Sequence, residues 1–307
     1  MATTGTPHLS LRPGVPVLSR DARVVQVGLD SPVVRLPDSP AVRSLLRALG
    51  RPGGLTAPGA PGEPGEPGEP GADAGAPEAV QVADALARLA RAGLLVEVSR
   101  HERGTDPVLG LLRAQYGPDA VRRRAARAAA LVAVHADPAT RATLAELMGR
   151  AGLRVAGAGD PDADVHVVVA GGALDRAVLD PLVRACVPHV AVHGSGAARR
   201  LGPFVQPGLT ACLRCVDAHE SVRDVRRSLL VAQAASIARE QPPPQDPVLE
   251  ALVLAWTVRD VTRYVEGDEP STWSATVDVG PGDGPRSTRW GRHPECGCSW
   301  DEFIDLP

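Results

Sequence analysis

Four cysteines occur as two closely spaced pairs, and such pairs are typical ligands of a zinc ion. Cys212 and Cys215 form a C-x-x-C pair, whereas Cys296 and Cys298 form a C-x-C pair near the end of the chain. A short spacing lets both sulfurs of a pair turn to one side, and Gly297 gives the C-x-C turn its backbone freedom. The sequence therefore predicts a tetrahedral zinc site with four thiolate ligands. Such a site leaves no coordination position open for substrate and is hence structural.

Two other interpretations of these cysteines remain open: two disulfide bonds, or four unrelated buried thiols. The odd total of five cysteines and the paired spacing favour zinc in a reducing cytoplasm. The fifth cysteine, Cys186, lies in an apolar segment, and we expect it to be a small core residue. His219 and His293 are close to the pairs in sequence. Either could replace a cysteine as ligand, but we favour positions beside the site or at the surface.

The composition excludes several classes of function. A net charge of −3 gives the chain no overall attraction to nucleic acid or to an anionic membrane. No run of about 18 apolar residues is present, and residues 1–14 lack the hydrophobic core of a secretory signal. We therefore expect a cytoplasmic protein without a membrane span. Lysine is absent, which excludes a P-loop lysine and a Schiff-base lysine.

Residues 129–307 are expected to form the α/β domain that holds the cysteines. Short apolar strands alternate with helices, as in a parallel, Rossmann-like sheet. Strands are predicted at 131–135, 153–156, 165–170 and 189–193, with helices at 139–150 and 174–185. Further helices are predicted at 221–240 and 247–265, followed by a hairpin of 272–279 and 286–290. Zinc binding would then join this hairpin to the end of the sheet.

The loop after the first predicted strand of this sheet lacks the features of a nucleotide site. A nucleotide-binding sheet carries G-x-G-x-x-G here, because glycines let backbone amides approach the phosphates. Residues 135–140 are instead HADPAT, in which Asp137 would repel a phosphate and Pro138 removes an amide donor. We therefore expect no bound ATP.

Residues 1–105 are predicted to form a small winged-helix domain. Strands within 15–36, helices at 41–49 and 78–93, and a closing strand at 94–98 follow in the order typical of that fold. Between the helices lies a collagen-like loop, 58–71, which we interpret as an extended acidic loop. Residues 106–128 are predicted to be a solvated linker helix that carries an arginine run.

The first cysteine pair lies in a longer motif. Residues 202–217 are GPFVQPGLTACLRCVD, which resembles the GPxVxPGxTxCLxCxD signature of ThiF-like proteins, degenerate relatives of ubiquitin-activating-type adenylyltransferases. These proteins are partners in the biosynthesis of azol(in)e-containing peptides, the TOMM class that includes bacteriocins. The predicted winged helix resembles their PqqD-like precursor-recognition element. The two parts together cover most of the chain.

The resemblance implies a function without intrinsic catalysis. The chain would bind the leader of a ribosomally made precursor peptide, as in RiPP biosynthesis. It would present that precursor to a YcaO-type cyclodehydratase, which forms thiazoles and oxazoles in an ATP-dependent reaction. The resemblance also implies a homodimer.

By the same resemblance, the leader adds as a strand to the edge of the winged-helix sheet, beside the last helix of that domain. Mapped onto this sequence, the peptide-binding residues are Val33, Val34, Leu36, Val82, Leu86 and Leu89. The alternative is that these six are core residues.

Two other functions remain open. An active ATP-dependent adenylyltransferase of the ThiF type would need a phosphate cradle and basic clamps, for which arginines could substitute. A zinc-containing winged-helix regulator would bind DNA. The helix predicted at 78–93 offers only Arg88 and Arg91 for that purpose, and the acidic balance of the chain disfavours it.

Overall fold

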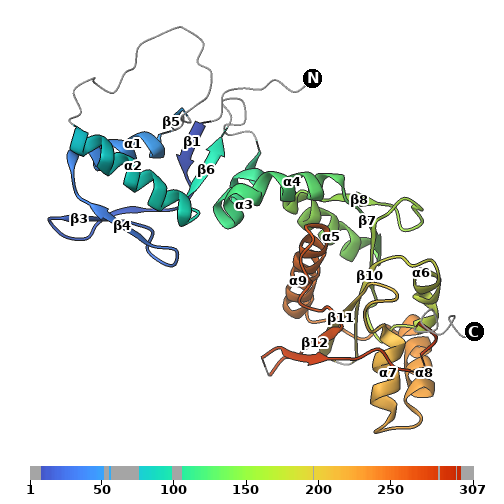
Figure 1. Ribbon diagram of the computed structural model, residues 1–307. Coiled ribbons are helices and arrows are strands. Elements are labelled where there is room, and N and C mark those ends of the chain that lie inside the picture. The colour runs from blue at the N-terminus through green and yellow to red at the C-terminus, as the bar shows by residue number, and fades with distance from the viewer. Residues whose placement is uncertain are drawn as a thin grey trace, which may run out of the picture. The chain divides into compact units, whose positions relative to one another are not determined.

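The computed structural model describes residues 8–51, 55–56, 76–98, 106–195, 197–282, 284–294 and 296–298 (Figure 1). The chain divides into two compact units, Met1–Arg124 and Ala125–Pro307, and each has its own hydrophobic core. The predicted domain boundaries, after residue 105 and before residue 129, lie on either side of this division. The collagen-like loop predicted at 58–71 lies outside the described residues.

The first unit contains two small antiparallel sheets, with strand orders β5-β1-β6 and β2-β3-β4. The strands are β1 (His8–Leu11), β2 (Val17–Ser19), β3 (Val24–Val27), β4 (Val34–Pro37), β5 (Leu55–Thr56) and β6 (Leu95–Val98). Buried residues alternate with less buried ones along β3 and β4, so one face of the second sheet lies on the core. The sequence does not predict β1 or β5, since strands this short leave no recognisable alternation.

Two helices, α1 (Pro40–Gly50) and α2 (Ala76–Arg91), pack with these sheets. The Ser39 hydroxyl caps α1 by accepting a hydrogen bond from the Val42 amide, and Pro40 lies in the first turn. Leu49 of α1 and Leu89 of α2 are fully buried in the shared core. The predicted helices are therefore present, whereas the winged-helix assignment stays a prediction.

The segment predicted as one linker helix forms two helices, α3 (Pro107–Tyr116) and α4 (Ala120–Ala129), separated by a 3-10 turn. The prediction that its arginines are solvated is wrong for two of them. The Arg123 guanidinium lies 3.9 Å from the centre of the Tyr116 ring, and Arg127 forms a buried ion pair with Glu266. An aromatic face and a carboxylate each stabilise a cation that the sequence pattern alone assigns to solvent.

The second unit is built on a seven-stranded sheet with the order β13-β12-β11-β10-β9-β7-β8. Its strands are β7 (Leu131–His135), β8 (Arg154–Ala156), β9 (Val165–Val169), β10 (His189–Ser195), β11 (Ala198–Val205), β12 (Ala275–Val279) and β13 (Arg286–Arg289). The α/β prediction is confirmed, but only β8, β7, β9 and β10 run parallel; β11, β12 and β13 are antiparallel. β11 escapes prediction because Arg199, Arg200, Gly202 and Pro203 interrupt its apolar pattern.

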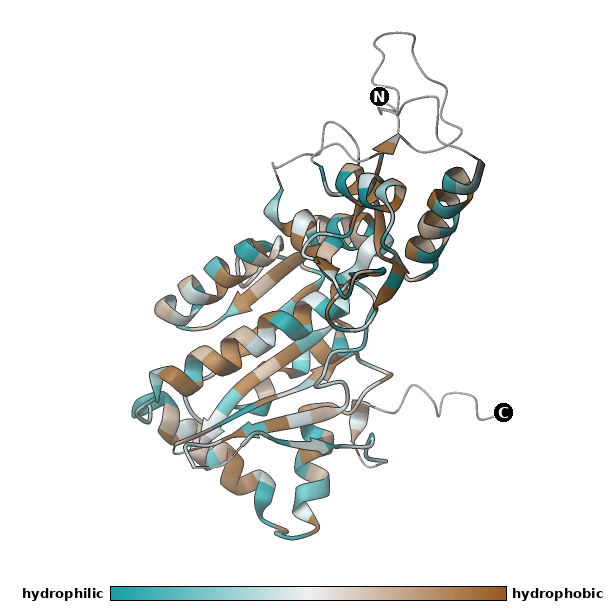
Figure 2. Ribbon diagram, turned by 90° about the vertical axis from the view of Figure 1, so that its left-hand side faces the viewer, coloured by the Kyte–Doolittle hydropathy of each residue, from teal (hydrophilic) through white to brown (hydrophobic). Residues whose placement is uncertain are grey.

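Helices cover both faces of this sheet (Figure 1). On one face α5 (Pro138–Ala151) and α9 (Pro247–Val265) lie side by side and bury Met148 and Val253 against the strands. On the other face α6 (Asp180–Arg184) and α7 (Leu213–Ser221) contribute Leu182 and Leu213 to a second cluster. Figure 2 shows hydrophobic residues along the strands, as expected for a sheet buried on both faces.

Two predicted helices are shorter than the sequence suggests. The helix expected at 174–185 is a 3-10 turn followed by the five-residue α6, and Pro181 lies at the start of α6. The helix expected at 221–240 is the end of α7 and a separate helix, α8 (Arg227–Glu240). Between them the Asp224 carboxylate accepts the Arg226 amide and forms a turn. No described helix is long and apolar enough to cross a membrane.

The buried ion pair of Arg127 and Glu266 makes a testable prediction about stability. Arg127→Ala should lower the free energy of unfolding by about 3–5 kcal/mol, since Glu266 would lose this cation while staying buried. The matched control is Arg150→Ala, which removes an exposed pair with Glu146 and should cost less than ~1 kcal/mol. Urea unfolding measures both. Equal effects of the two substitutions would contradict a stabilising buried pair.

Candidate functional site

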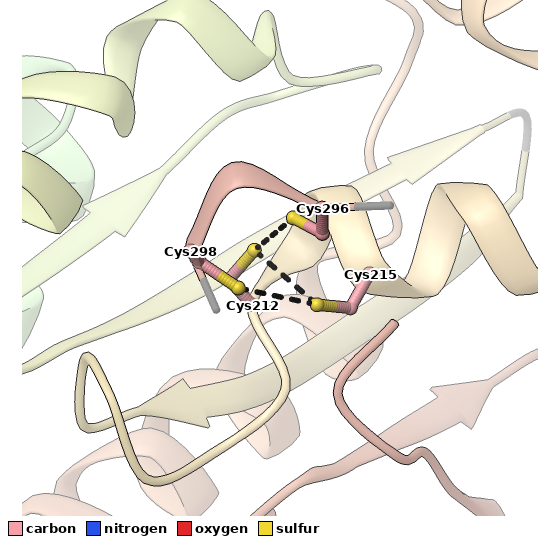
Figure 3. A group of neighbouring side chains, drawn as sticks. All are labelled: Cys212, Cys215, Cys296 and Cys298. Carbon is pink, nitrogen blue, oxygen red and sulfur yellow. Dashed lines mark hydrogen bonds between the residues drawn. The ribbon is translucent and has the colours of Figure 1, made fainter. Parts of the chain in front are cut away.

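The two cysteine pairs, far apart in sequence, meet at the amino-terminal end of α7 (Figure 3). Cys212 is the N-cap residue of α7, and Cys215 lies in its first turn. Cys296 and Cys298 come from the segment after β13. The four sulfurs lie within 4.8 Å of one another, and three of the cysteines are buried. The predicted grouping of these four residues is therefore confirmed.

The spacing of the sulfurs matches the needs of a tetrahedral metal ion. Zinc–sulfur bonds of about 2.3 Å at tetrahedral angles place two sulfurs ~3.8 Å apart. The Cys212 sulfur is 3.8 Å from that of Cys215 and 3.5 Å from that of Cys296, and the Cys215 and Cys298 sulfurs are 3.4 Å apart. A disulfide would need a bond of about 2.05 Å. The donor set thus fits a four-thiolate metal site and does not form the two disulfides.

The surroundings favour negative charge on the sulfurs. The first turn of a helix presents amide hydrogens and the positive end of the helix dipole to both Cys212 and Cys215. The His293 amide donates a hydrogen bond to the Cys215 sulfur at 3.3 Å. A hydrogen bond from Cys212 lowers the pKa of the Cys215 thiol to about 7, whereas the close sulfurs, Cys215 first, raise the pKa of Cys212. A bound cation would remove this conflict by stabilising all the thiolates together.

Residues before Cys212 in the GPFVQPGLTAC motif position the loop that leads to it. Gly202 has a φ of 90°, and a Cβ there would lie 2.5 Å from the Ala275 carbonyl oxygen of β12. Only glycine fits this close approach of two strands. Phe204 is fully buried, with its ring 4.7 Å from that of Tyr264 and 6.2 Å from that of Trp273. β11 is therefore anchored on both sides before the chain turns toward α7.

The turn between β11 and α7 is closed by a buried hydroxyl. The Thr210 oxygen accepts the Gln206 amide at 2.8 Å and donates to backbone carbonyls of the same turn. The next residue, Ala211, donates its amide to the Ser274 hydroxyl at 3.0 Å, beside β12. These bonds fix the position of Cys212 relative to the C-terminal hairpin. The threonine and the alanine thus have structural roles in the motif.

The second cysteine pair is held by the side chains of the hairpin and of α7. Trp290 donates its indole N–H to the Thr276 hydroxyl at 2.9 Å and packs against the cysteine cluster. His219 lies with its Nε2 3.0 Å from the Gly291 carbonyl, and its ring is in edge contact with that of His293. Among the described residues, neither imidazole belongs to the group of metal-ligand atoms. Both histidines lie beside the site, in agreement with the favoured interpretation.

The prediction for Cys186 is wrong. This residue is exposed and has a φ of 55°. α6 ends at Arg184, and the chain turns at Cys186 before β10 begins at His189. The apolar neighbours that suggested burial lie on either side of a turn.

The amino-terminal end of α5 takes the place of a phosphate cradle. Asp137 caps this helix, and its carboxylate accepts the amides of Ala139 and Thr140 at 3.0 and 3.1 Å. These bonds, chiefly those from Thr140, lower the pKa of Asp137, so a negative charge occupies the position where phosphate binds in nucleotide sites. Pro138 supplies no amide.

The six predicted peptide-binding residues separate into two groups. Val34, Leu36 and Leu89 are buried in the core of the first unit, so none of their side chains is exposed to a peptide. Val33 is exposed, and the remaining two, Val82 and Leu86, are partly buried against that core.

Two residues at the same edge are not among the predicted peptide-binding residues. Arg35 lies in β4, an edge strand, and Arg88 of α2 donates a side-chain hydrogen bond to the Arg35 carbonyl. This acceptor therefore points away from β3. The sequence gives no signal for this contact, because Arg88 is indistinguishable there from any other arginine on the exposed face of a helix.

Comparison with known proteins gives similarity at the level of the fold. The heterocyclase TruD superposes with a TM-score of 0.68 at 18% identity over 95% of this chain. A heterocyclase in complex with substrate and cofactor gives 0.66 at 18% identity over 97%. E. coli MccB with ATP gives 0.59 at 13% identity, covering 95% of this chain and 99% of MccB. No family model and no curated protein matches the sequence.

The likeness to the heterocyclases covers only part of those proteins. The chain spans 43% of TruD and 40% of the heterocyclase with substrate and cofactor. More than half of each heterocyclase therefore has no counterpart in this chain. The shared feature is an α/β fold of the kind found in TruD and MccB.

Metal content tests the four-cysteine site. The purified protein should contain one zinc ion per chain. Cys215→Ala should remove it, because the three remaining thiolates bind zinc more weakly than four. The matched control is Cys186→Ala, which changes an exposed cysteine outside the cluster and should leave zinc unchanged. Elemental analysis gives the stoichiometry. Well-folded wild-type protein with far less than one zinc would contradict the assignment.

Proposed function

We propose that this chain is a non-catalytic, peptide-binding partner of a YcaO-type cyclodehydratase in azol(in)e peptide biosynthesis. It holds the leader of a precursor peptide while the cyclodehydratase forms azolines on the rest of that peptide. The observation that carries this proposal is the likeness of 95% of the chain to 43% of the heterocyclase TruD. In this proposal, the separate cyclodehydratase takes the place of the part of the heterocyclase that has no counterpart in this chain.

The peptide adds to the outer edge of β4, next to α2. Hydrogen bonds of an antiparallel ladder alternate along a strand, so every second residue points its amide and carbonyl outward. The Arg35 carbonyl is such an outward group, because Arg88 reaches it from α2. Val33, two residues earlier, shares this orientation and is exposed. An extended peptide would replace Arg88 at this acceptor and extend the sheet.

The side chains around this edge suit an apolar or acidic leader. Val82 and Leu86 of α2 are partly buried and would contact side chains of the added strand. Arg88, once released from the Arg35 carbonyl, would exchange its exposed ion pair with Asp84, at 3.5 Å, for one with a peptide carboxylate. Val34 and Leu36 support the site indirectly, because their buried side chains anchor β4 to the core. In this proposal the six residues of the predicted site contribute in two ways, by contact and by support.

The metal centre has a structural role in this proposal. Four thiolates around one zinc leave no open position for water or substrate, which a catalytic zinc requires. The metal would join α7 to the segment after β13 and would stabilise the fold directly. Binding of zinc and binding of peptide then involve different units of the chain.

An active adenylyltransferase is the second candidate, because E. coli MccB, crystallised with ATP, resembles the chain over nearly the whole length of both proteins. Against it stands the Asp137 carboxylate, which occupies the amides at the start of α5. ATP–pyrophosphate exchange separates the candidates. Exchange that depends on the precursor peptide would favour the adenylyltransferase, and its absence in zinc-loaded protein supports the non-catalytic partner.

Leader binding at β4 is tested with a proline substitution. Arg35→Pro removes an outward amide without breaking the bonds of β4 to β3, so the affinity for a fluorescently labelled leader should fall by about tenfold or more. The matched control is Val17→Pro in β2, the opposite edge of the same sheet, which should leave affinity unchanged. Fluorescence anisotropy measures both. Equal affinities of Arg35→Pro and wild type, with circular dichroism showing folded protein, would exclude this edge.

A further inference from the structure

A pocket of the α/β unit, distinct from the cysteine cluster, lies at the carboxyl end of β10. It has a volume of about 250 Å³ and is bounded by the β10–β11 hairpin, α8 and the 3-10 turn at Arg176–Val178. Such ends of parallel strands are where α/β proteins usually bind ligands. Neither the zinc site nor the proposed peptide edge includes any residue of this pocket.

Four arginines line this pocket, and each forms an ion pair with a carboxylate. They are Arg176, Arg199, Arg200 and Arg227. Their ion-pair partners are Asp217, Glu250, Glu220 and Asp278, with Arg200 bound by both oxygens of Asp278 at 2.6 and 2.9 Å. Only Asp278 among these carboxylates lines the pocket itself. Each guanidinium that lines the pocket is therefore held in place by an ion pair with a carboxylate.

Three side-chain nitrogens of the pocket residues have no hydrogen-bond partner among the described residues: His193 Nε2, Arg199 Nε and Arg227 Nε. Arg199 Nε remains in an ion pair with Glu250, so His193 Nε2, in the tautomer protonated there, and Arg227 Nε are the two donors left without an acceptor. His193 is only 7% exposed. Its burial, and then the nearby arginines, Arg176 foremost, hold its pKa well below the ordinary value, so the ring is neutral at neutral pH. A buried donor without a partner costs free energy that an acceptor on a ligand would recover. Both donors therefore call for an acceptor inside the pocket.

Apolar side chains also line the pocket. They are Leu230, Val231 and Ala234 of α8, together with Ala173 and Ala198. The volume is below the ~300–1,000 Å³ of sites for drug-sized ligands, so the ligand must be small. Gly194 completes the floor, since a Cβ there would lie 2.4 Å from the Ala198 carbonyl oxygen and 3.3 Å from the Arg199 guanidinium.

We propose that this pocket binds the carboxylate of a small ligand with a branched alkyl body. The carboxylate accepts hydrogen bonds from His193 and Arg227 in the field of the other three arginines, and the alkyl group packs on the α8 wall. Binding of this kind is reversible and needs no covalent step. It is independent of leader binding, because all the residues involved belong to the second unit.

Isothermal titration of the zinc-loaded chain with 3-methylbutanoate, acetate and inorganic phosphate tests this proposal. 3-Methylbutanoate should bind at least several-fold more tightly than acetate or phosphate, because only its branched alkyl group contacts the apolar residues of the pocket. Arg227→Gln should weaken it by about tenfold or more, through loss of a charge-assisted hydrogen bond.

The matched control is Arg239→Gln on the same helix, which changes an exposed arginine outside the pocket and should leave affinity unchanged. Arg227 is itself partly exposed, so its substitution should preserve the fold, which circular dichroism checks. No binding of 3-methylbutanoate, equal binding of phosphate, or equal affinity of Arg227→Gln and wild type would each overturn the proposal.

Discussion

The convergence of four cysteine sulfurs at the start of α7 is the constraint on which the second unit depends. Cys212 and Cys215 lie on the α7 side, and Cys296 and Cys298 follow the β12–β13 hairpin. A metal ion bound there would hold two chain segments together that are distant in sequence. Two residues of the surrounding motif help to position these cysteines. Gly202 allows β11 to approach β12 closely, and Thr210 closes the turn that leads to Cys212. The residues that resemble a family signature therefore have a physical reason to occur together.

The same α/β architecture can support catalysis or binding, and local chemistry decides between them. At the first strand–helix turn, the Asp137 carboxylate takes the amides that a phosphate would need. At the carboxyl end of β10, by contrast, His193 and Arg227 present donors without partners among the described residues. Both positions lie at the carboxyl ends of parallel strands, so a carboxylate occupies the amides after β7 whereas donors at β10 lack an acceptor.

The sequence predicts the periodic parts of the structure and misses those that depend on distant partners. β7, α5 and α9 follow from apolar spacing, which is a local signal, and the structure adds that Asp137 and Asp246 cap the two helices. β11 is missed because the charges of Arg199 and Arg200 are neutralised by Glu250 and Asp278, which are remote in sequence. The cysteine cluster is predictable since paired spacing is itself the signal. The basic pocket is not, because its arginines come from three separate elements, the 3-10 turn at Arg176–Val178, β11 and α8.

The role of the chain in peptide modification is tested most directly by reconstitution. The precursor peptide is incubated with ATP and a YcaO-type cyclodehydratase, with and without the zinc-loaded chain, and its mass is followed by mass spectrometry. We expect loss of one water per heterocycle only when the chain is present, and no loss when the leader is removed from the precursor. Equal rates of water loss with and without the chain would contradict its role as the leader-binding partner.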